Sequence, residues 1–384
     1  MKLAFLFRSF TIIGGVEKIL IDKMNYFADS LGYEVLLLTY EQGNHPIAFP
    51  LSPKVKHIDL NILFYRRYRF GLLKRSWMFI RMRNDFRKAV KEQINFFEPD
   101  FTICTTYSYL DIETILHLKD KSKKIIETHS AKEAIGKKRK YQLDKQPVFI
   151  AAILDWKLYN LISKCSAFVT LTQNDALSWK NVKKTVVIPN ILNDYPLNIK
   201  YNPCSKKIIT IGRLVEQKGY DLLINAWRFV HQKHPEWSLD IYGSGKDKDA
   251  LLKSLIKYKI EKSVFIHEPI SDVYNKYMES SFYVMSSRYE GFGLVLAEAM
   301  SCGIPCVSFN CPHGPSEIIK NGEDGILVEA MNIEMLANKI CFMIENEDIR
   351  KQMSIKAREN VKRFLAENIM PKWVELFNTL LYEK

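Results

Sequence analysis

The chain has 384 residues, of which 47% are hydrophobic, and it carries a formal net charge of +13. This length exceeds what one ordinary core holds, so two domains of near-equal size are expected. No apolar run approaches the roughly 18 to 20 residues of a membrane-spanning helix. The excess positive charge indicates an anionic partner, for which nucleic acid, acidic lipid and phosphorylated small molecules all qualify.

Short runs rich in β-branched and aromatic residues alternate with segments of helical period, which is the pattern of βα units in parallel sheets. Six strands are predicted in the first half, at residues 2–7, 34–39, 101–105, 124–128, 167–171 and 186–189. Six more are predicted in the second half, at residues 208–212, 238–243, 264–268, 282–287, 305–309 and 325–328. The fold class is therefore α/β, with two Rossmann-like domains that face an interdomain cleft.

The stretch 190–205 is rich in Asn and Pro, and it predicts a linker with a domain boundary near residue 195. We expect an acceptor-binding domain at 1–195 and a donor-binding domain at 196–371. Pro371 is expected to break the helical C-terminal segment, so that a last helix at about 372–384 packs back on the first domain.

Seven cysteines and no C-x-x-C pair indicate reduced thiols in a cytoplasm. The densest group contains Cys302, Cys306, Cys311 and His313, but it lacks the paired spacing of a zinc site. We expect no metal and no cofactor.

Glycine-rich turns follow the first strand of each half. Gly14-Gly15 precedes a helical segment, where bare backbone N–H groups and the helix N-terminus suit an anion, although an ordinary tight turn explains the pair equally well. In the second half, Gly212 precedes Arg213 and Lys218. These two cations suit a leaving diphosphate, and the alternative is that both are solvated loop residues.

The strongest local pattern is Glu290-Gly-Phe-Gly-Leu-Val-Leu-Ala-Glu298, which follows the fourth strand of the second half. Its glycines expose N–H groups for phosphate at a helix start, Glu298 can accept from ribose hydroxyls, and Glu290 can accept from sugar hydroxyls. Paired carboxylates also suit a glycosidase, but their placement among phosphate-binding glycines argues against that reading.

Together these motifs resemble glycosyltransferase family 4, retaining enzymes of the GT-B fold. The similarity extends from Gly14-Gly15 through the segments that begin at Gly212 and Glu290 to Asn321-Gly-Glu-Asp-Gly-Ile-Leu-Val328. The segment that begins at Cys311-Pro-His-Gly-Pro-Ser-Glu is most similar to bacterial enzymes that extend lipid-linked saccharides with N-acetylhexosamine or galactose.

The resemblance implies roles for particular residues. The implied catalytic positions are Arg213 and Lys218 at the donor diphosphate, Glu290 at the transferred sugar, and His129 beside that sugar. The implied donor-binding positions are Gly14, Gly15, Gly212, Pro269, Ile270, Gly291, Phe292, Gly293, Leu294 and Glu298. Pro269 and Ile270 stand where relatives carry a Phe-x-Gly turn near the base, and this departure leaves the identity of the base open.

The mechanism that the resemblance implies needs no enzymic nucleophile and no metal, because the leaving diphosphate itself receives the proton of the acceptor hydroxyl. Asp247-Lys248-Asp249 spells the D-x-D of metal-dependent glycosyltransferases. Its place at the start of a polar helix favours a helix-dipole role instead.

Residues 64–91 contain ten basic residues and one acidic residue among aromatic side chains. An amphipathic pattern starts near Leu72, with an apolar stripe through Phe79 and Phe86. We expect an anionic membrane surface that also meets the acceptor, at Arg66, Arg67, Arg69, Lys74, Arg81 and Lys88. Residues 137–140, Lys-Lys-Arg-Lys, would extend this surface. The alternatives are that the stripe packs on its own domain or that the segment binds single-stranded nucleic acid.

The sequence thus predicts a metal-independent enzyme that moves a hexose or N-acetylhexosamine from a nucleotide-linked donor to a lipid-linked or saccharide acceptor in polysaccharide biosynthesis. UDP is the expected nucleotide of the donor. It is expected in the cytoplasm, peripheral on the inner face of the plasma membrane, with no nucleic acid partner. The alternatives are a GT-B nucleotide-sugar epimerase and a non-catalytic nucleotide-sugar-binding membrane adaptor.

Overall fold

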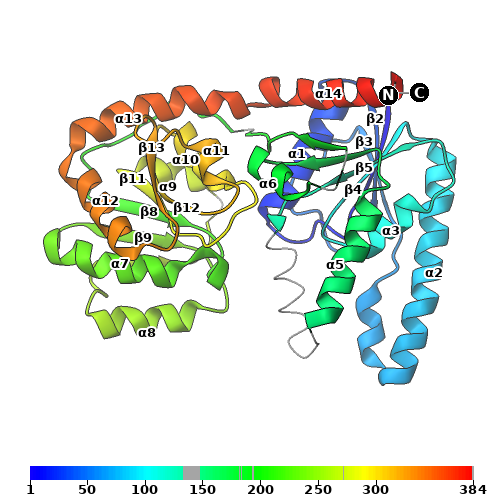
Figure 1. Ribbon diagram of the computed structural model, residues 1–384, viewed down its shortest axis with the longest axis horizontal. Helices are drawn as coiled ribbons and strands as arrows, with labels where there is room; N and C mark the ends of the chain where they lie inside the picture. The colour runs from blue at the N-terminus through cyan, green and yellow to red at the C-terminus, as the bar shows by residue number, and fades with distance from the viewer. Residues whose placement is uncertain (133–147, 181, 183, 193, 271, 383–384) are drawn as a thin grey trace.

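The structure, a computed structural model, describes residues 1–132, 148–180, 182, 184–192, 194–270 and 272–382. Two parallel sheets with their helices form two domains that lie side by side (Figure 1). The predicted α/β class with two Rossmann-like domains is confirmed. In the described part of the chain, no helix combines the length and apolar character needed to span a bilayer.

The N-terminal sheet has seven strands in the order β3-β2-β1-β4-β5-β6-β7, and every pairing is parallel. Its elements are β1 (Lys2–Leu6), α1 (Gly15–Asp29), β2 (Glu34–Thr39), β3 (Val55–Asp59), η1 (Phe64–Arg69), α2 (Leu72–Phe97), β4 (Phe101–Thr105), α3 (Tyr109–Leu116), β5 (Lys123–Glu127), α5 (Val148–Ile162), β6 (Ala167–Thr170), α6 (Gln173–Ser178) and β7 (Thr185–Val187).

The prediction of six strands in the first half is wrong, because β3 is a seventh. Its sequence, Val-Lys-His-Ile-Asp, has three polar residues in five. A strand at the edge of a sheet needs few apolar residues, since only part of it is buried, so its sequence pattern is weak.

The C-terminal sheet has six parallel strands in the order β10-β9-β8-β11-β12-β13. Its strands and the helices between them are β8 (Lys207–Ile211), η2 (Glu216–Lys218), α7 (Tyr220–Lys233), β9 (Ser238–Tyr242), α8 (Lys248–Tyr258), β10 (Val264–His267), α9 (Val273–Met278), β11 (Phe282–Met285), α10 (Leu294–Ser301), β12 (Cys306–Asn310), α11 (Pro315–Ile318) and β13 (Gly325–Glu329). In both sheets the strand order reverses at the first strand of the domain, and the loops after β1, β4, β8 and β11 lie at these switch points, where open α/β sheets bind ligands.

The C-terminal segment is helical and contains α12 (Ile333–Glu345), α13 (Glu347–Asn360), η3 (Val361–Phe364) and α14 (Ala366–Tyr382). The predicted break at Pro371 is wrong, because this residue lies inside α14 and the helices are interrupted at Leu365. Pro371 lacks only the N–H that would bond one carbonyl in the first turn, and the buried face of α14 holds the helix in place. Figure 1 shows α13 over the C-terminal domain and α14 over the N-terminal domain.

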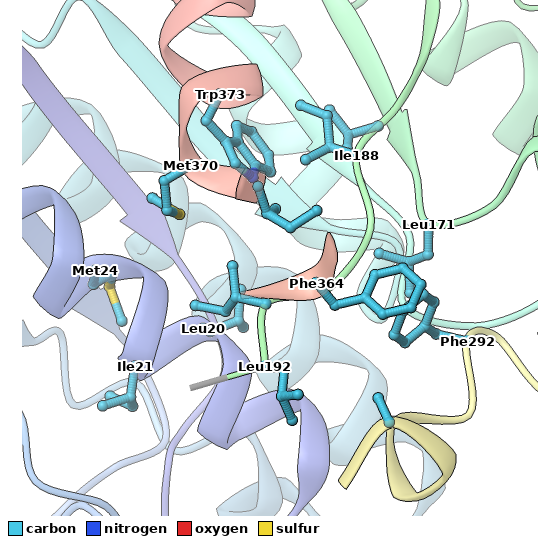
Figure 2. Packing of buried hydrophobic residues seen from close by; sticks show 14 of the residues in the cluster. Leu20, Ile21, Met24, Leu171, Ile188, Leu192, Phe292, Phe364, Met370 and Trp373 are labelled. Atoms are coloured by element: carbon cyan, nitrogen blue, oxygen red, sulfur yellow. The ribbon is translucent and has the colours of Figure 1, made fainter. Parts of the chain in front are cut away.

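One hydrophobic cluster joins the two domains. It contains residues of α1, α10 and α14, and Figure 2 shows Leu192, Phe292 and Phe364 at the junction. The rings of Phe292 and Phe364 pack edge to face, with their centroids 5.3 Å apart. The backbone N–H of Leu192 donates a hydrogen bond to the carbonyl oxygen of Phe364. On α14, Phe377 packs on Phe101 of the first sheet with ring centroids 4.6 Å apart. The two domains therefore share one buried apolar surface, and the chain segments at Leu192 and Phe364 are hydrogen-bonded to each other at their junction.

Candidate functional site

A cavity of about 470 Å³ lies between the domains, at the switch points of both sheets. Residues from both halves of the sequence line it. The predicted site residues in its walls are Gly14, Gly15, His129, Gly212, Arg213, Lys218, Glu290, Gly291, Phe292, Gly293 and Leu294. Residues that lie up to 280 positions apart in sequence thus meet around one space.

The N-terminal wall is the start of α1. Gly14 precedes the helix with extended backbone, and the carboxylate of Glu17 from the first turn lies close to it. A Cβ on Gly15 would meet no atom within 4 Å, so this backbone is open to the cavity. The positive end of a 15-residue helix therefore faces the space between the domains.

The C-terminal wall supplies two cations. Lys218 Nζ lies 2.7 Å from Glu290 Oε1, and the hydroxyl of Ser287 donates to the same oxygen at 2.5 Å. Both partners of this ion pair are largely buried, so it holds a fixed geometry. Arg213 is exposed to the cavity, and its guanidinium donates a 3.4 Å hydrogen bond to the neutral side chain of Gln217. One cation is anchored, whereas the other is available to a ligand.

The loop after β11 of the C-terminal domain lies in close contact with the backbone of the N-terminal domain. A Cβ on Gly291 would lie 2.6 Å from the backbone oxygen of His129 and 3.1 Å from Cα of Ser130. Any larger residue at 291 would force the two domains apart. Next to it, Gly293 has φ of 90°, a left-handed conformation that suits glycine, and it starts α10 so that the first amides of this helix face the cavity.

His129 contacts a buried ion pair, Lys23 with Glu127, that the sequence did not suggest. Its Nε2 lies 3.2 Å from Oε2 of Glu127, and the same oxygen accepts from Lys23 Nζ of α1. Burial alone would raise the pKa of Glu127, but the charges of Lys23 and His129 lower it to about 2. The Lys23 ammonium also lies 4.4 Å from the ring of Trp373 on α14. The position of His129 is thus tied to α1 and to the C-terminal helix.

Three predicted donor-binding residues do not line this cavity. Glu298 lies one turn into α10, where the Tyr277 hydroxyl is 3.5 Å from its Oε2, and burial raises the pKa of Glu298 to about 7. Pro269 and Ile270 follow the edge strand β10, two strands away from β8. Asp247 and Asp249 begin α8, also outside these walls.

Sequence reasoning missed several side chains of the cavity. They either follow strand ends or belong to the helical turns and loops of the motif segments: Glu17, Tyr107, Asn190, Gln217 and Tyr289. The rule that ligands bind beyond the carboxyl ends of parallel strands could have identified Tyr107 after β4 and Asn190 after β7.

A second cavity, of about 760 Å³, lies in the N-terminal domain and shares Ile12, Glu17 and Tyr107 with the first. Among its walls are Arg8, which pairs with Glu41, and the predicted surface residue Arg66. Burial raises the pKa of Asp111, another wall residue, to about 7. The two cavities are therefore adjacent, and the second is lined by both cationic and acidic side chains.

The other predicted surface residues lie away from both cavities, with Arg67 and Arg69 on η1 and Lys74, Arg81 and Lys88 on α2. The predicted extension of this surface at residues 137–140 lies outside the described residues.

All seven cysteines are free thiols, and Cys302, Cys306 and Cys311 are buried. Among the described residues, no three His, Cys, Asp or Glu side chains gather in a way that could hold a metal ion.

The comparisons with known proteins agree with this geometry. A model of the family "Glycosyl transferases group 1" matches residues 199–360. An uncharacterized glycosyltransferase of Haemophilus influenzae is 28% identical over 97% of this chain and 98% of its own length. The amylovoran biosynthesis glycosyltransferase AmsD of Erwinia amylovora is 33% identical over 60% of this chain and 67% of its own length.

Among solved structures, a mutant of S. aureus TarM in complex with fondaparinux, α-GlcNAc-glycerol and UDP has a TM-score of 0.77 at 18% identity, and the match covers 98% of this chain and 99% of that one. This likeness concerns the fold. With the family model, the relatives and the two facing Rossmann-like domains taken together, the chain belongs to the group 1 glycosyltransferases and is a glycosyltransferase of GT-B architecture.

Proposed function

We propose that this enzyme is a retaining, metal-independent glycosyltransferase of family 4 that moves a hexose or N-acetylhexosamine from a UDP-linked donor to a saccharide or lipid-linked acceptor in polysaccharide biosynthesis. The observation that carries the proposal is the interdomain cavity, where Arg213, Lys218 and the starts of α1 and α10 converge. Two cations and two helix N-termini around one space suit a diphosphate better than any uncharged ligand.

The chemistry follows from the charge that develops during transfer. As the bond between C1 of the sugar and the diphosphate oxygen breaks, negative charge grows on the leaving group, and Arg213 and Lys218 stabilise it. The acceptor oxygen attacks C1 from the same face, and its proton passes to a diphosphate oxygen. Glu290 accepts from a sugar hydroxyl, and its contact with Lys218 couples sugar binding to diphosphate binding.

The second cavity suits the acceptor. It opens beside the first through Ile12, Glu17 and Tyr107, so an acceptor held there reaches the donor sugar without crossing bulk solvent. Its mixture of Arg8, Arg66, Glu41 and Asp111 suits a polar ligand rich in hydroxyl groups.

The relatives support the choice of donor and pathway. The relative AmsD is named for amylovoran biosynthesis, and the TarM mutant contains UDP. Built-in cations make a divalent metal unnecessary for holding a diphosphate, which supports metal independence.

A screen of UDP-, GDP- and ADP-sugars for thermal stabilisation tests the donor first, because a ligand that binds the native state raises the melting temperature. UDP-sugars are expected to stabilise most. The stabilising donor is then incubated with an acceptor panel in EDTA, and the anomeric configuration of the product is determined by NMR. An inverted product, or turnover only with added metal, contradicts the proposal. Release of an isomerised free donor indicates an epimerase, and binding without any product indicates an adaptor.

A further inference from the structure

The hairpin formed by η1 and the first turns of α2 carries an exposed apolar face. Leu73, Trp77 and Ile80 are 90%, 56% and 53% exposed, and their spacing of four and three residues places them on one side of the helix. Leu72 is also exposed, as are the rings of Tyr65 and Tyr68 on η1. Large apolar side chains grouped in this way on the surface of a protein mark a site of contact with another protein, a membrane or a ligand.

The same helix behaves differently in its second half. Met82, Phe86, Val90 and Ile94 recur every four residues and are buried against the N-terminal sheet. The packed stripe and the exposed face therefore lie on different sides and different turns of one helix, and packing on the domain accounts only for the packed stripe. In Figure 1 the start of α2 projects from the N-terminal domain, away from α14.

Cations flank the exposed face. Lys74, Arg81 and Lys88 recur every seven residues next to Leu73, Trp77 and Ile80, and all three are exposed. The guanidinium of Arg81 lies 5.8 Å from the Trp77 ring. Rings with neighbouring cations suit the headgroup level of an anionic bilayer, where apolar side chains reach the acyl boundary.

A second helix supports this surface. The N-terminal end of α5 points to the same side of the N-terminal domain as that of α2 (Figure 1), and Ile153 and Trp156 in the middle of α5 are exposed. Charge decides between possible occupants. Residues 64–91 hold ten basic residues and one acidic residue, so two copies of this surface repel each other, whereas an anionic bilayer attracts it.

We propose that the exposed side chains of η1 and the start of α2, together with Ile153 and Trp156 of α5, form a docking surface for an anionic bilayer, such as the inner face of the plasma membrane. Tyr65 and Arg66 of η1 also line the 760 Å³ cavity, so docking places the mouth of the acceptor cavity at the lipid headgroups. This inference deepens the proposed function, and it rests on that function for the identity of the acceptor, which would be a saccharide carried on a lipid.

The test is co-sedimentation of the full-length protein with phosphatidylcholine vesicles, with and without phosphatidylglycerol, in low and high salt. No donor or acceptor is present, so this result is independent of glycosyl transfer. We expect binding to the anionic vesicles only, weakened by salt. The triple variant Lys74→Glu, Arg81→Glu, Lys88→Glu should weaken binding by about a hundredfold, and Leu73→Ser with Trp77→Ser should also weaken it.

The matched control is Lys253→Glu, Lys257→Glu, Ile256→Ser on α8, whose three side chains are exposed on the C-terminal domain. This control should bind vesicles like the wild type. Unchanged thermal midpoints and unchanged UDP binding show that the α2 variants are folded. The proposal is overturned if the wild type does not bind anionic vesicles, or if the α2 variants bind as it does. It is also overturned if the α2 substitutions dissolve a dimer or abolish oligonucleotide binding but leave vesicle binding intact.

Discussion

Oε2 of Glu127 lies 3.2 Å from Nε2 of His129, beneath the floor of the interdomain cavity, and the same carboxylate oxygen accepts from buried Lys23. The three side chains come from β5, the loop that follows it and α1. A buried charge that loses its partner is costly, whereas a neutral pair of similar size is tolerated. The orientation of His129 therefore depends on an ionic pair whose two members must be present together.

This arrangement predicts strong coupling between Lys23 and Glu127. Lys23→Met and Glu127→Gln should each lower the free energy of unfolding by about 3 to 5 kcal/mol, because each removes one member of a buried ion pair and leaves the other buried without it. The double variant should cost clearly less than the sum of the two. Urea denaturation of the four proteins measures the coupling. Lys351→Met, which removes an exposed pair with Glu347, is the control and should cost less than about 1 kcal/mol. Additive effects at Lys23 and Glu127 would refute the coupling.

Arg213→Ala should lower kcat by about a hundredfold or more, which corresponds to roughly 3 kcal/mol of lost transition-state stabilisation. The reason is that Arg213 faces the cavity and bonds to the neutral side chain of Gln217, so its charge is available to the leaving diphosphate. Steady-state kinetics with the stabilising donor measure the effect. Lys253→Ala removes an exposed cation of the same domain and should leave kcat unchanged. A normal kcat in Arg213→Ala would remove this residue from the catalytic step.

Gly291→Ala tests the close approach of the domains. The added Cβ would lie 2.6 Å from the backbone oxygen of His129, and backbone cannot yield as a flexible side chain does. We expect the domains to move apart, the radius of gyration in small-angle X-ray scattering to increase, and activity to fall severely. In the control, Gly71→Ala, the new Cβ meets no atom within 4 Å, so shape and activity should not change. A compact, active Gly291→Ala protein would show that the domains do not meet here in solution.

The sequence predicted the strands well because their apolar runs are short and bounded by turns. Glu34–Thr39 and Phe101–Thr105 were predicted to the residue, and β3 was missed because an edge strand needs few apolar side chains. The motif residues Arg213, Lys218 and Glu290 could be named because they stand in loops directly after predicted strands.

Other features depend on residues that are distant in sequence, and no local pattern reports them. Lys23 and Glu127 are 104 residues apart and meet only once α1 packs on the sheet. The contact of Gly291 with His129 depends on how two separately folded domains are placed. On α2 the periodicity predicted an apolar stripe correctly, but it could not show which turns are covered by the domain and which are exposed.

The last prediction concerns pH and Glu298, whose pKa burial raises to about 7. An unfolded glutamate titrates near about 4.3, so between these two values the folded protein binds more protons than the unfolded chain. The contribution of this group to stability is therefore present at low pH and is lost as pH rises from about 4 to 7. Glu298→Gln cannot ionise, so its stability relative to the wild type should increase by about 2 kcal/mol between pH 5 and pH 8.

Thermal midpoints of both proteins across this range measure the difference, and Glu334→Gln on the exposed surface of α12 is the control. A constant difference for Glu298→Gln would mean that this carboxylate is solvated and already ionised in the folded enzyme. In that case it would be accessible to a ribose hydroxyl without any change in protonation, whereas a protonated Glu298 must lose its proton before both of its oxygens can act only as acceptors toward the hydroxyls of a donor nucleotide.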